Sequence, residues 1–185
     1  MAGLAGLLLP ACQLDSDEAF RPRHEASYLL WQRPGGGRTL LRATDSSLEA
    51  GFQARLGILA PSGLSRQRDI LYITDSAAPR YATYSPATRT ARLRPLPFAA
   101  SGLAAGLERL LVLDSAGHRL AFLPYGAEAP TAVFPLAFAP TQAAYHAHFF
   151  VVGGAGGEVL VFQEDALARI DSAAYGLPVR RISLA

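Results

Sequence analysis

The chain has 185 residues, of which half are hydrophobic and 17% are charged, so it has enough apolar side chains to bury a core. Disordered chains are poor in apolar residues and rich in charge, which excludes that class. The formal net charge is only +2, and the 17 basic residues are all arginines scattered along the sequence. Nucleic-acid binding, which needs a clustered basic surface, is therefore not expected.

The first eleven residues are apolar and uncharged, and residues 7–11 lead directly into Cys12, the single cysteine. One cysteine excludes an internal disulfide framework. The segment resembles a bacterial lipoprotein signal, in which the cysteine is lipidated and becomes the mature N-terminus. That resemblance implies export to the bacterial periplasm or outer membrane, with contact to the membrane only through Cys12. The alternative is a buried or frayed N-terminal segment in which the cysteine is incidental.

Three regions follow from this pattern. Residues 1–12 are the signal and anchor cysteine, residues 13–26 are a polar tether, and residues 27–185 are the folded part. The tether is predicted because residues 13–26 are polar and mixed in charge and lie between the anchor and the folded part. No other segment reaches the roughly 18 uninterrupted apolar residues that a membrane helix needs.

The folded part contains an internal repeat. Residues 55–76 align without a gap on residues 94–115, with Ser-Gly-Leu at 62–64 and 101–103 and Asp-Ser at 75–76 and 114–115. A third copy follows at an offset of 40 residues, in which Leu120 and Phe122 become Leu160 and Phe162. Self-similarity at a period of 20 to 50 residues is typical of solenoids and propellers.

Each copy has the same predicted internal order. A continuous apolar run at 70–73, 110–113 and 149–152 is bounded by turn residues, which favours a strand buried on both faces. We take this run as the innermost strand of its unit. The other predicted strands are 80–84, 119–123 and 158–162, then 90–96 and 131–136, with 99–107 and 139–146 as connections. A diverged first unit takes 27–32, 38–43 and 52–59 as strands, and 166–172 and 177–184 supply the last strands.

The phrase at residues 71–76, followed by residues 84–88, resembles the YVTN and NHL classes of β-propeller repeat. The resemblance implies an all-β, propeller-like array of antiparallel blades around a central channel. About four units fit this chain, whereas those families usually close with six or seven. Three explanations stay open: a four-bladed ring, a truncated chain, or a half that pairs with another copy.

The repeat places Asp69, Glu108 and His148 at one equivalent position, just before the run taken as the innermost strand. Equivalent positions in a propeller are related by rotation, so these side chains are predicted to ring one mouth of the channel. Carboxylates and imidazoles are suitable ligands for a divalent cation, and His146 has the spacing to join His148 on one metal. The alternative is that polar residues simply begin strands at a solvated rim.

The predicted function is a non-enzymatic module of the bacterial cell envelope that binds an unidentified protein or small molecule. No cofactor is expected, apart from a divalent cation if the metal site exists. The alternative is a metal-dependent hydrolase acting on a lactone or ester at the channel mouth. The predicted layout of the chain resembles that of propellers of the gluconolactonase type. No catalytic residue of that family is matched to a residue of this sequence. A truncated fragment and self-association of an incomplete ring stay open.

Overall fold

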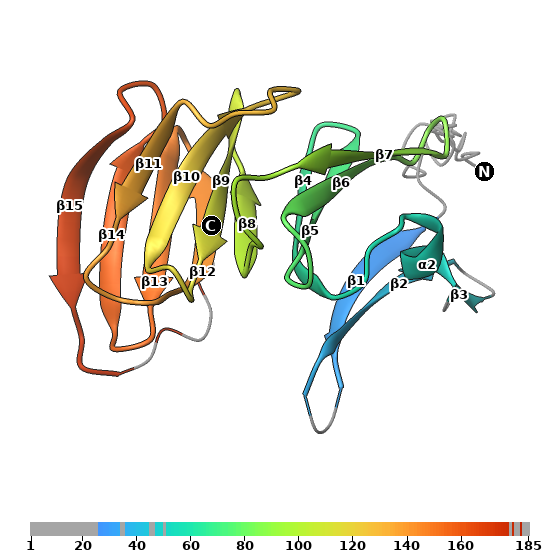
Figure 1. Ribbon diagram of the computed structural model, residues 1–185, viewed down its shortest axis with the longest axis horizontal. Helices are drawn as coiled ribbons and strands as arrows, with labels where there is room; N and C mark the ends of the chain where they lie inside the picture. Colours follow the sequence, from blue (N-terminus) through green and yellow to red (C-terminus); the bar gives the residue numbers. More distant parts are fainter. Residues whose placement is uncertain are drawn as a thin grey trace, which may run out of the picture.

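The computed structural model describes residues 26–33, 36–44, 47–49, 51–177, 179 and 182. The predicted signal, Cys12 and nearly all of the tether lie outside this part of the chain. No helix within it is both long and apolar enough to cross a membrane. The described strands form four separate antiparallel sheets, which follow one another in chain order from β1 to β15 (Figure 1).

The first sheet has three strands and the other three sheets have four each. In chain order the strands are β1 (Ser27–Gln32), β2 (Arg38–Ala43) and β3 (Leu48–Glu49); β4 (Pro61–Gln67), β5 (Ile70–Asp75), β6 (Arg80–Ser85) and β7 (Thr90–Pro95); β8 (Gly102–Ala105), β9 (Arg109–Asp114), β10 (Arg119–Pro124) and β11 (Ala132–Pro135); and β12 (Pro140–His146), β13 (Phe149–Gly154), β14 (Glu158–Gln163) and β15 (Ala168–Ala174). A single turn of helix, α2 (Phe52–Arg55), joins the first sheet to the second.

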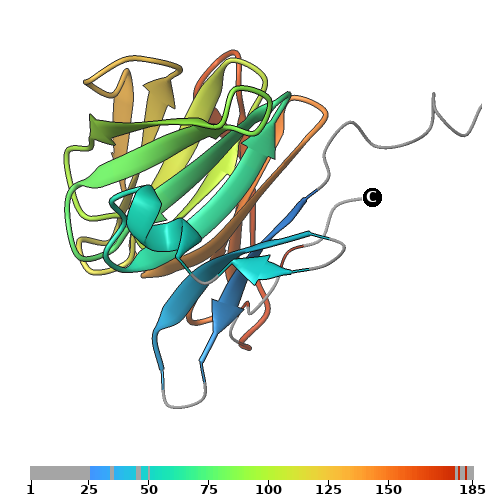
Figure 2. The ribbon, with the colours of Figure 1, turned by 90° about the vertical axis from the view of Figure 1, so that its right-hand side faces the viewer.

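In each four-stranded sheet the first strand makes the closest backbone contacts with the neighbouring sheets. Strand β8 lies between β4 and β12, and strands β1 and β2 contact β4. Within each sheet the chain then steps away from this inner strand through antiparallel hairpins. The arrangement is that of a β-propeller with four blades, as the repeat predicts. The first sheet extends beyond the block formed by the other three (Figure 2).

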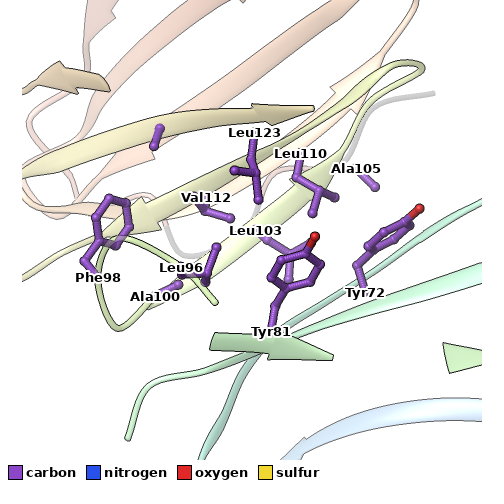
Figure 3. Close-up of a cluster of buried hydrophobic side chains, with 11 residues drawn as sticks. Tyr72, Tyr81, Leu96, Phe98, Ala100, Leu103, Ala105, Leu110, Val112 and Leu123 are labelled. Carbon is purple, nitrogen blue, oxygen red and sulfur yellow. The ribbon is translucent and has the colours of Figure 1, made fainter. Parts of the chain in front are cut away.

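The core consists of three apolar clusters, one at each interface between successive sheets. Strand β9 shows how they form, because successive side chains of a strand point to opposite faces. Leu110 and Val112 pack toward the second sheet, and Leu111 and Leu113 pack toward the fourth. Burial on both faces explains the unbroken apolar runs in the sequence. In the cluster between the second and third sheets, Tyr72 and Tyr81 face the leucines of the third sheet (Figure 3).

The two end sheets each carry exposed apolar side chains. In β1, Leu29 and Trp31 are 47% and 53% exposed, and in β13 Phe149 is 38% exposed. Both sets belong to sheets that have a neighbouring blade on one side, whose apolar residues pack into the shared clusters. These side chains therefore mark the outer faces of the array.

The prediction that residues 70–73, 110–113 and 149–152 form the innermost strands is wrong. These runs are β5, β9 and β13, the second strands of their sheets. The innermost strands lie one step earlier, in segments rich in small and polar residues, such as β4 and β8. Residues 99–107 and 139–146, taken as connections, contain β8 and β12. Pairing with the apolar second strand, rather than their own composition, holds these segments extended.

Residues 52–59 were predicted as a strand, and this is also wrong. Phe52 and Leu56 lie four residues apart and are both buried, which suits one face of the short helix α2. Gly57 follows with a φ of +69°, the left-handed conformation that commonly ends helices at glycine. The third strand of this sheet is instead the two-residue β3. Strand β15 confirms the prediction for 166–172, whereas most of 177–184 lies outside the described residues.

Candidate functional site

A pocket of about 300 Å³ lies where the inner strands of the four sheets meet. Its described lining consists of residues 62–64 of β4, 101–103 at β8, 141–143 of β12, and Leu30, Gln32 and Arg38 from the first sheet. Every sheet contributes, so the pocket belongs to the assembled array rather than to one hairpin. Central pockets built by several elements are where small-molecule sites are usually found.

The three inner-strand segments carry a hydroxyl residue at the same repeat position: Ser62, Ser101 and Thr141. The Ser62 hydroxyl donates to the carbonyl oxygen of Ala100 over 2.5 Å. The Ser101 hydroxyl donates to the carbonyl oxygen of Leu113 over 3.1 Å. The Thr141 hydroxyl donates to the carbonyl oxygen of Val179 over 3.0 Å. These protons are committed to backbone carbonyls, so the hydroxyls position the inner strands rather than act as nucleophiles.

The next position holds Gly63, Gly102 and Gln142. A Cβ on Gly63 would lie 2.8 Å from the backbone nitrogen of Leu103, so glycine is what lets β4 and β8 approach each other. A Cβ on Gly102 would only reach ordinary contact, 3.5 Å from Leu113 Cδ1. The two glycines leave backbone groups of the inner strands accessible at the pocket, and Gln142 adds an amide.

Arg38 brings a positive charge to the pocket. One of its terminal nitrogens, Nη1, donates to the carbonyl oxygen of Ser62, which fixes the guanidinium against β4. No carboxylate among the described residues forms an ion pair with it. A guanidinium has five N–H donors, so several remain for a ligand.

The residues predicted as a metal site lie elsewhere. Asp69, Glu108 and His148 occupy the turns that follow the inner strands, whereas the pocket lies near the beginning of those strands. Asp69 pairs with Arg66 over 3.4 Å, and Glu108 pairs with Arg109 over 3.5 Å. Both carboxylates are mostly exposed.

His146 is the exposed last residue of β12. His148 lies in the following turn with a φ of +71°. Within the described part of the chain, no group of three or more His, Cys, Asp or Glu side chains is close enough to hold a metal ion. The metal hypothesis thus rests on the repeat alignment of Asp69, Glu108 and His148 and on the spacing of His146 from His148, and it stays a prediction.

The turn that contains Glu108 is held by a buried carboxylate that the sequence did not reveal. Glu164, which is 0% exposed, accepts hydrogen bonds from the backbone amides of Leu107 (3.1 Å), Glu108 (2.9 Å) and Arg109 (3.3 Å). It also accepts one from the hydroxyl of Tyr145 over 2.6 Å. Burial, reinforced by this bond to Glu164, raises the pKa of Tyr145 to about 12. Glu164 therefore ties the fourth sheet to the third.

A second buried carboxylate, Asp75, stabilises the connection into β4. It accepts hydrogen bonds from the backbone amides of Leu59 and Ala60 and from Nε of Arg80, each within 3.0 Å. Burial acts to raise the pKa of Asp75, but these hydrogen bonds outweigh it, so the net pKa is lowered. Asp114 repeats the pairing with Arg119 in the next sheet, at 2.8 Å. These carboxylates support the blades and are not free for ligands.

Sequence reasoning missed the pocket residues, although one signal pointed to them. The triplet at 62–64 and 101–103 is identical in the two copies. A hydroxyl residue followed by glycine recurs at the same position of both copies. Such a pattern indicates that two backbone segments approach each other closely there. Residues 101–103 were placed in a connection and residues 62–64 in no predicted strand, because the apolar runs after them resemble inner strands more closely.

No known protein family and no curated protein matches the sequence. Solved structures do match the fold. A chain of the mitotic checkpoint complex gives a TM-score of 0.61 at 10% identity, covering 80% of this chain and 48% of that one. A chain of the nidogen/laminin complex gives 0.57 at 16% identity, covering 77% of this chain and 57% of that one. Myxococcus xanthus glutaminyl cyclase gives 0.51 at 17% identity, covering 64% and 53%.

The four sheets and their central pocket thus define a β-propeller-like protein of four blades. The chain spans about half the length of the three structures described above. Their identities, all below 20%, establish the fold and nothing about activity.

Proposed function

We propose that the chain is a non-enzymatic binding module of the bacterial cell envelope, of the YVTN/NHL type of propeller, whose ligand occupies the central pocket. The observation that carries the proposal is the lining, to which all four sheets contribute polar groups, three of them hydroxyl residues at equivalent positions of the inner strands. A rigid sheet scaffold that converges on one polar pocket suits recognition.

The ligand expected in this pocket is a small polar molecule or the end of a peptide. A volume of about 300 Å³ lies at the lower limit of small-molecule sites. Gln32 and Gln142 each supply both donors and an acceptor, and Arg38 supplies further donors. Leu30 and Leu103 add apolar surface. This mixture suits a ligand with several hydroxyl, amide or carboxylate groups.

Binding is favoured over catalysis by the chemistry of the lining. Among its described residues Arg38 is the only one with an ionisable side chain. An arginine stays protonated and cannot act as a general base. The three hydroxyls lie on backbone carbonyls, with no histidine or carboxylate in the described lining to take their protons.

The pocket is tested by filling it. In Gly102→Gln the new side chain copies Gln142 at the equivalent position, and the space around Gly102 accommodates a Cβ. We expect at least one member of a panel of monosaccharides and dipeptides to bind the wild type in ligand-observed NMR, and to lose binding in Gly102→Gln. The exposed substitution Glu128→Gln serves as the control and should leave binding unchanged. Binding by no panel member, or equal binding to the filled variant, would contradict the proposal.

The envelope location is tested separately through Cys12. Radiolabelled fatty acid supplied to the producing bacterium should be incorporated into the wild type and not into Cys12→Ser. Labelling of both proteins, or of neither, rules out the anchor.

The hydrolase alternative depends on a metal. Elemental analysis of the purified protein, combined with thermal unfolding before and after chelation, separates the two functions. A stoichiometric divalent metal whose removal lowers the melting temperature would favour the enzyme and Asp69, Glu108, His146 and His148 as its ligands. No bound metal, with unchanged melting, favours the binding module.

A further inference from the structure

A second cavity, of about 280 Å³, lies away from the central pocket, in the outer part of the interface between the second and third sheets. We call it the arginine groove. Most of its lining comes from one face of the second sheet, and Gly126 lines it from the connection between β10 and β11. The residues of the second sheet are Ile70 and Tyr72 of β5, Thr83 and Ser85 of β6, and Thr90, Arg92 and Arg94 of β7. None of these residues lines the central pocket, so this is a separate feature of the molecule.

The interface between the third and fourth sheets shows which residues occupy the corresponding positions there. In the second sheet Tyr81 pairs with Arg94 and Thr83 with Arg92. In the third sheet Leu120 pairs with Phe134 and Phe122 with Ala132. These pairs occupy equivalent positions in the repeat. Thr83 therefore takes the position of Phe122, and Arg94 takes the position of Phe134. Two aromatic rings have been replaced by a hydroxyl and a guanidinium.

The replacement leaves two positive charges side by side. Arg92 and Arg94 are two residues apart on β7 and project from the same face of the sheet. Neither forms an ion pair with a carboxylate of the described chain, whereas Arg80 and Arg119 each pair with an aspartate within 3.0 Å. Arg94 donates through Nη1 to the carbonyl oxygen of Gly126 over 3.0 Å, which anchors its guanidinium at the groove. Two positive charges that no carboxylate of the described chain compensates, held in a preformed groove, are suited to bind an anion.

Further donors lie on the same face. The Thr83 hydroxyl makes only a long contact of 3.4 Å to the carbonyl oxygen of Arg92. Tyr72 forms no hydrogen bond through its hydroxyl to another described residue, and the buried hydroxyl of Tyr81 also has no partner there. Burial raises the pKa of Tyr72, although the charges of Arg68 and Arg94 oppose the rise.

We propose that the arginine groove is a binding site for a phosphate monoester of a small organic molecule. Two guanidiniums and several hydroxyls offer more donors than the two oxygens of a carboxylate accept. A phosphate monoester has three terminal oxygens and up to two negative charges, which match two arginines. The organic part of the ligand packs on Ile70 and Tyr72, and the volume of the groove exceeds what a free ion needs.

Phenyl phosphate is the probe, titrated by isothermal calorimetry at low ionic strength. We expect Arg92→Gln and Arg94→Gln each to weaken binding about tenfold, because each removes a charge-assisted hydrogen bond. Arg169→Gln, an exposed arginine of β15, controls for net charge, and Arg38→Gln controls for the central pocket. Both controls should bind like the wild type. Circular dichroism confirms that each variant is folded.

Three companion ligands define the chemistry. Phenyl sulfate should bind more weakly than phenyl phosphate, because it carries one charge, and benzoate should bind weakest. Inorganic phosphate should also bind more weakly, because it lacks the ring. The proposal is overturned if phenyl phosphate does not bind, if benzoate or inorganic phosphate binds equally well, or if Arg169→Gln weakens binding as much as the groove variants. Loss of binding in Arg38→Gln alone would assign the ligand to the central pocket and overturn the groove site.

Discussion

The two interfaces on either side of the third sheet are built on the same plan but filled differently. Between the third and fourth sheets, the ring of Phe122 meets those of Phe134, Phe150 and Phe162 at centroid distances of 5.5 to 5.8 Å, all in edge-to-face geometry. Between the second and third sheets, the position of Phe122 is taken by Thr83, and the interface opens outward into the arginine groove. Both interfaces also contain a cluster of buried apolar side chains.

The difference shows that a propeller interface needs only part of its area for packing. Apolar burial contributes roughly 25 cal/mol per Å², so giving up an aromatic layer costs stability that the fold must recover elsewhere. The interface between the third and fourth sheets has its aromatic layer and also the Glu164 contact. The other interface has Thr83 and Arg94 at the positions of Phe122 and Phe134, and a binding site there would account for the loss of both rings.

The largest effect is expected from Phe122→Ala. This ring is fully buried and touches three others, so its removal should lower the free energy of unfolding by about 3–5 kcal/mol. Thr83→Ala at the equivalent position should cost less than about 1 kcal/mol, since the groove is open. Urea denaturation followed by fluorescence measures both. Similar losses in the two variants would show that the interfaces are packed alike, contrary to the comparison.

A smaller effect is expected from Glu164→Gln. The amide keeps the size of the carboxylate but cannot accept hydrogen bonds at both ends from three backbone amides and Tyr145. We expect a loss of about 2 kcal/mol in the same denaturation experiment, typical of hydrogen bonds to a charged group. The exposed Glu128→Gln should change stability by less than about 0.5 kcal/mol. An unchanged Glu164→Gln would mean that the carboxylate does not hold the two sheets together.

The sequence predicted the repeat, its four units and the outer strands, because long apolar runs bounded by turn residues have few other solutions. It did not predict β4 and β8, whose small and polar residues have no strand pattern of their own. Their conformation is imposed by pairing with β5 and β9, which is tertiary information. The inner strands were therefore shifted by one position, and the candidate site was shifted with them.

The candidate site shows the same limit. Equivalence by repeat places Asp69, Glu108 and His148 in corresponding turns, but it does not fix their distance from the centre of the array. The pocket residues were visible as the repeated Ser-Gly-Leu triplet without a sign of which face they occupy. Glu164 was out of reach for another reason, since its amide partners lie more than 50 residues earlier in the chain.

The Glu164 contact also predicts a response to alkaline pH. The pKa of Tyr145 is about 12 in the folded protein and about 10 in an unfolded chain, so the unfolded state releases its proton first. The stability that depends on this proton is complete below pH 10 and is lost as pH rises from 10 toward 12. Tyr145→Phe should reduce the slope of stability against pH in that window. If the slope in Tyr145→Phe equals that of the wild type, the proton of Tyr145 does not contribute to the stability of the Glu164 contact.

The smallest change in stability is expected from Arg92→Ala, which gives the groove the residue that Ala132 supplies in the other interface. Arg92 is exposed and forms no ion pair with a described carboxylate, so the free energy of unfolding should change by less than about 0.5 kcal/mol. Two neighbouring cations also repel each other, and removing one relieves that repulsion. A loss above about 1 kcal/mol in urea denaturation would show that the arginine stem packs between the sheets. In that case Arg92 is a structural residue, and only Arg94 remains to give the groove its charge.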